Sequence, residues 1–135
     1  MATILITGTN KGVGLELTKI YAARGDTVYA ACRDPAGASA LAEVPGEVVI
    51  LPLVVGDSGS VTAMAEQLAG VTIDIVINNA GMKGPEFEQQ NTYAMDFDGW
   101  AETFNVNSMG PVRVMQALMP NLKQAEAAKV VTITS

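Results

Sequence analysis

The segment "TGTNKGVG", from Thr7 to Gly14, has the composition of a loop that binds a phosphate. Its glycines permit positive φ angles and allow a ligand to approach the backbone closely. A helix that starts behind such a loop offers unpaired N–H groups and a partial positive charge, which favour an anion. The spacing G-x3-G-x-G matches neither G-x-G-x-x-G nor a P-loop. The glycines could form a purely structural turn, but their place between a strand and a helix favours a nucleotide phosphate.

Arg33 is the second residue whose type and position suggest binding chemistry. It follows an apolar strand segment and lies 19 residues after Gly14. In a βαβ unit, the end of the second strand approaches the adenosine ribose, where an acid binds the 2′-hydroxyl and an arginine binds a 2′-phosphate. Lys11 adds another cation, so we expect NADP(H), with NAD(H) as the alternative cofactor. Arg33 could instead be a solvated residue paired with Asp34.

Short apolar segments alternate with helical patterns along the chain. Strands are expected over 3–7, 27–32, 48–55, 73–77 and 129–135, and Pro52 indicates an edge or a bend in the third. Helices are expected over about 13–24, weakly over 35–43, from Ser58 or Ser60 onward, and over about 97–123 with a break at Gly110–Pro111. This alternation predicts an α/β fold made of right-handed βαβ units: one doubly wound, Rossmann-type domain over 1–135, with strand order 3-2-1-4-5 and helices on both faces of the sheet.

Composition excludes several classes of protein and site. The 135 residues carry a net charge of −6, which argues against nucleic acid as a partner. The chain has no histidine, which removes histidine-based triads and most zinc sites, and we predict no metal site. Its one cysteine, Cys32, cannot form an intrachain disulfide and is expected to be a small buried residue. No apolar run reaches 18 residues and no signal peptide is recognisable, so we expect a cytoplasmic protein without a membrane partner.

Together with two later segments and the end of the chain, the glycine loop resembles the classical short-chain dehydrogenase/reductase family. "TGTNKGVG" is similar to the cofactor loop T-G-x3-G-x-G of that family, and "NNAG" (78–81) to its signature after the fourth strand. "NVNSMG" (105–110) resembles its N-x-x-G segment, and "VVTITS" (130–135) its strand ending in a catalytic serine. The resemblance covers essentially the whole chain. It implies cofactor contacts from Gly8, Thr9, Asn10, Lys11, Gly12, Val13, Gly14, Arg33, Asn79, Ala80 and Gly81, and catalytic roles for Asn107 and Ser135.

The resemblance implies an oxidoreductase of the carbonyl reductase or alcohol dehydrogenase type. Such an enzyme moves a hydride between the nicotinamide and the carbonyl or alcohol carbon of a small molecule. Its serine holds the substrate oxygen, a tyrosine transfers the proton, and a lysine four residues later lowers the pKa of that tyrosine. Its asparagine completes a water-mediated proton path. Members commonly associate through the helix that spans about 110–123 here, so a homo-oligomer is expected.

The chain departs from the family pattern in two places. No tyrosine is followed four residues later by lysine, because those positions after Tyr21, Tyr29 and Tyr93 are Gly25, Arg33 and Phe97. Val54 stands where the family usually has an aspartate that contacts adenine, while Asp57 is expected to cap the next helix.

These departures lead to alternative predictions about the role of the chain. The first is the N-terminal, dinucleotide-binding part of an NADP(H)-dependent oxidoreductase, truncated after the fifth strand and inactive alone. The alternative is a standalone dinucleotide-binding module or pseudoenzyme without turnover. A scaffold that binds no nucleotide is a third reading, which the intact glycine loop disfavours.

Asn107 also has a physical interpretation that does not depend on the resemblance. Pro111 lies four residues later and has no N–H to donate to the backbone carbonyl of Asn107. We therefore predict that this carbonyl faces the site and is available to a water molecule. Alternatively, Pro111 merely occupies the favoured first position of a new helix.

Overall fold

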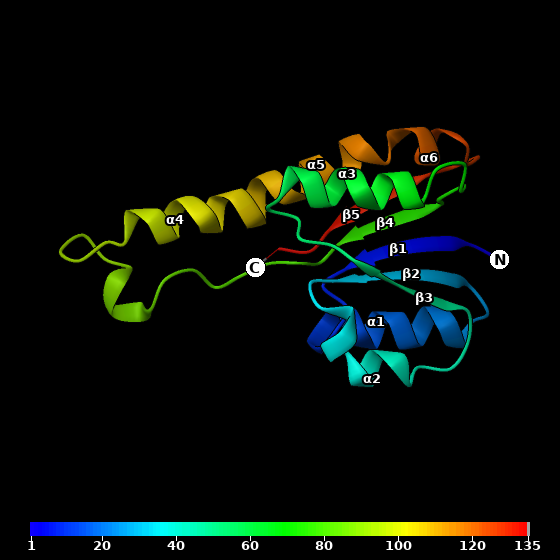
Figure 1. Cartoon of the computed structure of the whole chain (residues 1–135), viewed down its shortest axis with the longest axis horizontal. Coiled ribbons are helices and arrows are strands. Elements are labelled where there is room, and N and C mark those ends of the chain that lie inside the picture. The colour runs from blue at the N-terminus through cyan, green and yellow to red at the C-terminus, as the bar shows by residue number, and fades with distance from the viewer. Residues whose placement is uncertain (135) are drawn as a thin grey trace.

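A single parallel sheet of five strands, with order β3-β2-β1-β4-β5, forms the centre of the computed structural model, which describes residues 1–134 (Figure 1). This order confirms the sequence prediction: the chain first runs outward from β1 to β3, then reverses once and adds β4 and β5 on the other side of β1. The strands are β1 (Thr3–Thr7), β2 (Thr27–Cys32), β3 (Val48–Pro52), β4 (Ile75–Asn78) and β5 (Lys129–Thr132).

Helices cover both faces of the sheet, which confirms the doubly wound α/β fold (Figure 1). The helices α1 (Gly12–Ala23) and α2 (Ser39–Ala42) pack on one face, and α3 (Ser58–Gln67), α5 (Gly110–Ala117) and α6 (Met119–Lys123) pack on the other. Between and beyond them lie α4 (Phe97–Phe104), the 3₁₀ turns η1 (Pro35–Gly37) and η2 (Phe87–Gln89), and the π-helical turn η3 (Asn105–Met109).

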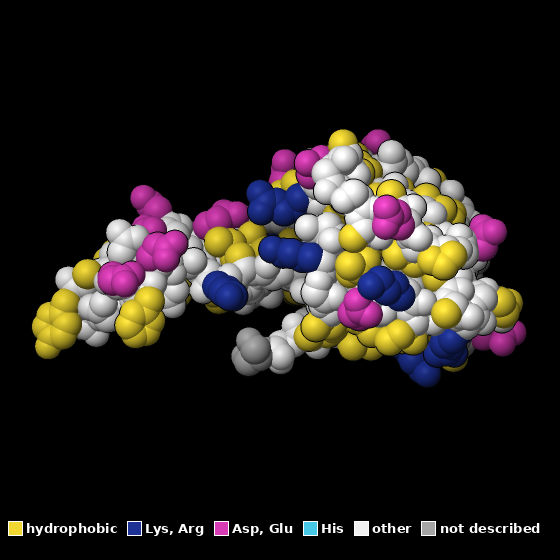
Figure 2. Space-filling view, turned by 90° about the horizontal axis from the view of Figure 1, so that it is seen from below, with side chains coloured by type: hydrophobic (Ala, Val, Ile, Leu, Met, Phe, Trp, Pro, Cys, Tyr) yellow, Lys and Arg dark blue, Asp and Glu magenta, His cyan; other side chains and the backbone are white. Residues whose placement is uncertain are grey.

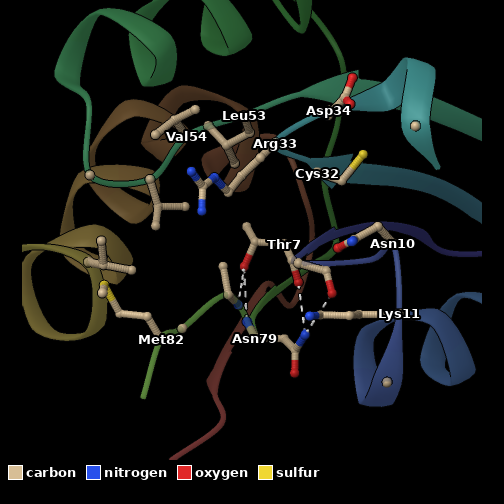
Figure 3. Close-up of a pocket in the computed structure, with 18 of the residues that line it drawn as sticks. Thr7, Asn10, Lys11, Cys32, Arg33, Asp34, Leu53, Val54, Asn79 and Met82 are labelled. Atoms are coloured by element: carbon tan, nitrogen blue, oxygen red, sulfur yellow. Dashed lines mark hydrogen bonds between the residues drawn. The ribbon is translucent and has the colours of Figure 1, made fainter. Parts of the chain in front are cut away.

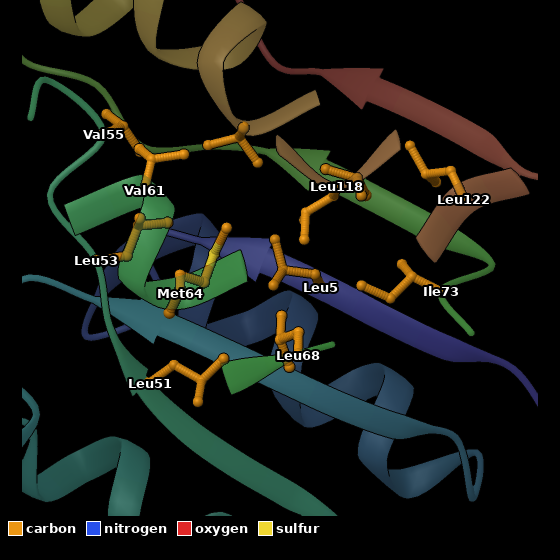
Figure 4. Close-up of a cluster of buried hydrophobic side chains, with 13 residues drawn as sticks. Leu5, Leu51, Leu53, Val55, Val61, Met64, Leu68, Ile73, Leu118 and Leu122 are labelled. Carbon is orange, nitrogen blue, oxygen red and sulfur yellow. The ribbon is translucent and has the colours of Figure 1, made fainter. Parts of the chain in front are cut away.

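The central strand β1 shows why its sequence is apolar throughout. Ile4, Leu5 and Ile6 all have 0% of their surface exposed. Ile4 and Ile6 pack toward α1 and α2, whereas Leu5 packs among Met64 and Leu118 on the opposite face (Figure 4). Because successive side chains of a strand point to opposite faces, a strand covered on both sides needs apolar residues at every position.

Several element boundaries differ from the sequence prediction. β3 ends at Pro52 instead of residue 55, although the backbone N–H of Leu53 still donates to the carbonyl of Cys32 at 2.9 Å. β3 is an edge strand, as Pro52 suggested. Proline has no backbone N–H to donate to a neighbouring strand, and an edge strand tolerates this loss. The weak helix over 35–43 divides into η1 and α2. The N-cap of α3 is Asp57, whose Oδ1 accepts from Gly59 N at 2.8 Å, as expected.

The long helical stretch over 97–123 is interrupted twice. The break expected at Gly110–Pro111 is a π-helical turn, in which the N–H of Gly110 donates to the carbonyl of Asn105, five residues earlier. A second interruption, between α5 and α6, places Pro120 in the first turn of α6 and was missed in the sequence prediction. Proline removes an intrahelical bond in both cases, so the chain changes its helical register there.

The segment 83–104 projects from the body of the molecule (Figures 1 and 2). Hydrophobic and acidic side chains are mixed on its surface, and Phe87 and Tyr93 are 86% and 99% exposed. The rings of Phe97 and Trp100 stack with their centroids 6.0 Å apart at the start of α4. Across residues 1–134, no helix combines the length and the apolar character that a bilayer crossing requires.

Candidate functional site

A pocket of about 930 Å³ lies at the carboxyl ends of the strands. Its walls come from the loops that follow β1, β2, β3 and β4, together with the end of α4 and the start of η3 (Figure 3). The pocket sits where β1 lies between β2 and β4, so that the connections on its two sides run in opposite directions. Open α/β sheets bind ligands in the crevice at such a switch point.

Gly12 and Gly14, in the loop after β1, are glycine for different structural reasons. A Cβ atom on Gly14 would lie 2.1 Å from the carbonyl oxygen of Gly8, so the start of α1 can approach the loop only because Gly14 lacks a side chain. Gly12 has a φ of +58°, and a Cβ atom there would meet nothing within 4 Å. Gly12 lines the pocket, and its missing side chain leaves open space where a ligand could contact the backbone.

The N-terminus of α1 lacks a capping side chain, in contrast to α3 and α4. The side chains of Asp57 and Asp96 accept backbone N–H groups at the starts of α3 and α4. The N-cap residue of α1 is Lys11, whose side chain makes no such bond. The first N–H groups of any helix have no intrahelical acceptor, and in α1 no capping side chain supplies one, while Gly12 at its start lines the pocket. An uncapped N-terminus beside the open space at Gly12 fits a phosphate group.

Hydrogen bonds hold the glycine loop against the neighbouring strands. The hydroxyl of Thr9 donates to the carbonyl of Ala31 at 3.0 Å, and its backbone N–H donates to the same oxygen at 3.2 Å. Thr9 has 0% exposure, so its predicted contact with a cofactor could come only through the shape of the loop. Asn10, Lys11 and Gly12 line the pocket, and their contacts with a cofactor stay predictions.

The segment after β4 is tied to the end of β1 by a compact set of bonds (Figure 3). The Nδ2 group of Asn79 donates to the carbonyls of Thr7 at 3.1 Å and of Gly8 at 3.0 Å. The buried hydroxyl of Thr7 accepts the backbone N–H groups of Asn79 at 3.0 Å and of Ala80 at 2.9 Å. Asn79, Ala80 and Gly81 all line the pocket, so the predicted residues of the "NNAG" segment lie beside the glycine loop.

Arg33 and Asp34 point in different directions at the end of β2. The guanidinium of Arg33 extends over the pocket toward Val54, whereas the carboxylate of Asp34 turns toward η1 (Figure 3). There, Oδ2 of Asp34 lies 2.7 Å from the position that a Cβ atom of Gly37 would take. Ion pairs within residues 1–134 join Lys19 to Glu16 and Arg24 to Asp26, and none joins Arg33 to Asp34. The alternative of a surface pair is therefore wrong in this structure.

Cys32 forms part of the pocket wall but is only 2% exposed. Burial raises the pKa of its thiol above the ordinary value; a backbone hydrogen bond from Asp34 acts in the opposite direction, and the charge of Asp34 adds a smaller increase. The prediction of a small buried residue is confirmed. A buried thiol with a raised pKa is a poor nucleophile near neutral pH, so Cys32 shapes the wall of the pocket.

Asn107 connects the π-helical turn to the segment that follows β4. Its Nδ2 group donates to the carbonyl of Met82 at 2.8 Å, and its Oδ1 atom accepts the backbone N–H of Met82 at 2.9 Å. Pro111 lies in the first turn of α5, so it serves as a helix start and also denies the carbonyl of Asn107 its usual donor. The catalytic role of that carbonyl stays a prediction. The other predicted catalytic residue, Ser135, lies outside the described residues.

Arg113 and Asn105 also organise the site, and the sequence prediction missed both. Arg113 Nη1 donates to the carbonyls of Val55 at 3.1 Å and of Asn105 at 3.2 Å, and Nη2 contacts Oδ1 of Asn105. Nδ2 of Asn105 donates to the carbonyl of Gly56 at 2.9 Å. These bonds fasten the loop after β3 to the π-helical turn. The only sequence signal was a cation three residues after Gly110, in a helix that is otherwise largely apolar.

The family model described as "short chain dehydrogenase" matches residues 2–135. The chain belongs to the short-chain dehydrogenase family. It is 34% identical to mouse (Mus musculus) retinol dehydrogenase 12 over 140 residues and to human (Homo sapiens) 17-beta-hydroxysteroid dehydrogenase type 1 over 144 residues. Each match covers 98% of this chain and 42% of the relative, so the chain spans less than half the length of these proteins.

Solved structures of carbonyl reductases share this fold. A carbonyl reductase from Pseudomonas aeruginosa PAO1 superimposes with a TM-score of 0.88 and 27% identity, covering 100% of this chain and 60% of the other. An NADPH-bound carbonyl reductase from chicken fatty liver superimposes with a TM-score of 0.85 and 29% identity, with the same coverage. The family model and these superpositions therefore agree on both the family and the fold of this chain.

Proposed function

We propose that this chain binds NADP(H) in the pocket at the carboxyl ends of its strands, as the dinucleotide-binding half of an oxidoreductase acting on a small-molecule carbonyl or alcohol. The observation that carries the proposal is the uncapped start of α1 beside the open space at Gly12. Such a site attracts a phosphate, because unpaired N–H groups and the helix dipole act on the same point. Family membership and the structural likeness to carbonyl reductases support the same conclusion.

Several of the predicted cofactor residues line the pocket and have a role in this proposal. Gly12 and the start of α1 would hold the pyrophosphate, and Asn79 to Gly81 would lie along the dinucleotide. When bound, the nicotinamide would supply the hydride that is exchanged with the substrate carbon. Asn107 would hold a water through its backbone carbonyl, while its side chain fixes the turn on Met82. Ser135 would bind the substrate oxygen, as the resemblance implies.

The preference for NADP(H) over NAD(H) rests on two exposed cations at the pocket. Arg33 and Lys11 both line the pocket, and within residues 1–134 Arg33 forms no ion pair with Asp34. Lysine and arginine side chains also gather where the projecting segment meets the body, although the chain as a whole is acidic (Figure 2). A 2′-phosphate would gain charge-assisted hydrogen bonds from Arg33 that a 2′-hydroxyl could not match.

Calorimetric titration of the chain with NADPH and NADH tests this assignment. We expect NADPH to bind more tightly, and Arg33→Ala to weaken NADPH binding about 10- to 100-fold, because a hydrogen bond to a charged group contributes about 1.5–3 kcal/mol. Binding of NADH should change less than about threefold. Lys19→Ala, which removes a cation outside the pocket, is the matched control. Equal losses for both dinucleotides in Arg33→Ala would refute the 2′-phosphate contact.

A second candidate function is a dinucleotide-binding module without turnover, because the 135 residues contain no Tyr-x3-Lys pair. An unassisted phenol has a pKa near about 10 and is a poor base at neutral pH. We expect the 135-residue chain to bind NADPH without oxidising it in the presence of aldehydes or ketones. Turnover at ordinary enzyme rates would contradict both the prediction of a half that is inactive alone and the prediction of a binding module without turnover.

The expected homo-oligomer stays a prediction, which size-exclusion chromatography tests. The cytoplasmic location also stays a prediction.

A further inference from the structure

Glu102 places a carboxylate on the pocket wall at a point that the resemblance to the family did not indicate. It lies on the last turn of α4 and lines the pocket. Its Oε1 atom is 3.3 Å from the position that a Cβ atom of Gly56 would take, so the missing side chain at Gly56 leaves room for this carboxylate beside the loop after β3. Nδ2 of Asn105 donates to Oε2 at 3.4 Å. Within residues 1–134, no hydrogen bond is directed to Oε1.

The surrounding wall is suited to an aromatic base. Leu53, Val54, Val55 and Val106 line it with apolar side chains. The backbone N–H of Val54 is already bonded to Oγ of Ser60 at 2.8 Å, and Val54 carries no carboxylate. The edge formed by the loop after β3 therefore offers little polar recognition at this residue, where the resemblance implies an aspartate that contacts adenine.

We propose that Glu102 accepts a hydrogen bond from the 6-amino group of adenine, in place of the aspartate that Val54 replaces. The proposal rests on the proposed function, because it requires a bound adenine dinucleotide. An ionised carboxylate only accepts hydrogen bonds, so it favours an amino group over the oxo group that hypoxanthine carries at the same ring position. Glu102 thereby acts as a residue that selects the base of the cofactor, from α4 instead of from β3.

The test compares NADPH with its deamino analogue, in which hypoxanthine replaces adenine. We expect the wild-type chain to bind NADPH at least about 10-fold more tightly than the analogue, since a hydrogen bond to a charged acceptor is replaced by two opposed acceptors. Glu102→Gln keeps the shape of the side chain, and its amide can donate to an oxo group, so the ratio of the two affinities should fall to about threefold or less. Glu66→Gln, an exposed change on α3, should leave the ratio at its wild-type value.

Adding Val54→Asp to the Glu102→Gln variant should restore the preference for NADPH, because the carboxylate then returns at the facing edge. A wild-type ratio in Glu102→Gln would overturn the role of Glu102 while leaving NADP(H) binding intact. Failure of the wild-type chain to bind either dinucleotide would instead overturn the proposed function, and the role of Glu102 with it. The two failures are therefore distinguishable in one set of titrations.

Discussion

The hydroxyl of Thr7 accepts two backbone N–H groups of the segment after β4 and so helps to join that segment to the end of β1. Thr7 is 1% exposed, and its Oγ1 atom accepts the N–H groups of Asn79 and Ala80 at 3.0 and 2.9 Å. Thr7→Val keeps the shape of the side chain but removes this acceptor. Both N–H groups then lose their partner in a region that is only partly open to water, so the change should destabilise the protein at the edge of the pocket.

The size of the effect follows from these two bonds. A buried donor left without an acceptor costs about 1–3 kcal/mol. Asn79 and Ala80 are half-buried, so water can partly replace the lost acceptor, and we expect a total loss of about 2–4 kcal/mol in the free energy of unfolding. Thr7→Ser keeps the hydroxyl and removes one buried methyl group, which should cost about 1 kcal/mol.

Urea denaturation followed by circular dichroism measures both losses. With a slope of about 1–3 kcal/mol per molar urea, Thr7→Val should lower the midpoint by about 1–2 M. Amide hydrogen exchange gives an independent readout, in which the N–H groups of Asn79 and Ala80 should exchange faster in Thr7→Val than in Thr7→Ser. The reasoning is refuted if the valine variant is as stable as the serine variant, or if these two amides keep their wild-type protection.

Two further predictions concern the glycine loop and the buried thiol. Gly14→Ala should lower the free energy of unfolding by about 1–3 kcal/mol, because the new Cβ would lie 2.1 Å from the carbonyl oxygen of Gly8. Gly12→Ala should cost more binding free energy for NADPH than free energy of unfolding. If urea titrations show a larger loss than the binding titrations do, a ligand at Gly12 is contradicted. Because burial raises the pKa of Cys32, the folded state retains a proton that the unfolded state loses, so stability should fall above about pH 8.5. Cys32→Ala should remove that part of the slope in urea titrations between pH 7 and 10, and an unchanged slope would exclude Cys32 as its source.

Local patterns in the sequence were enough to predict the strands of the sheet and most of the loops that line the pocket. A strand covered on both faces must be apolar at every position, so the segments around Ile4 to Ile6 were recognisable without any partner. The glycine loop was equally readable, because the close approach of Gly14 to Gly8 is a backbone requirement within one turn. The missing N–H of Pro111 predicted the break in the long helix, although the sequence pattern did not distinguish a π-helical turn from a simple kink.

Contacts between distant segments could be decided only by the tertiary structure. Arg113 bonds to Val55, 58 positions away, and Asn107 bonds to Met82, 25 positions away, and neither pair has a periodic signature. The orientation of Arg33 over the pocket, away from its neighbour Asp34, depends on the shape of the loop around η1. Glu102 reaches the pocket because Gly56, on another loop, leaves room for it. Sequence alone thus determined the backbone of the site, because turns and strands obey local rules, whereas the side chains facing the ligand were decided by how those elements pack.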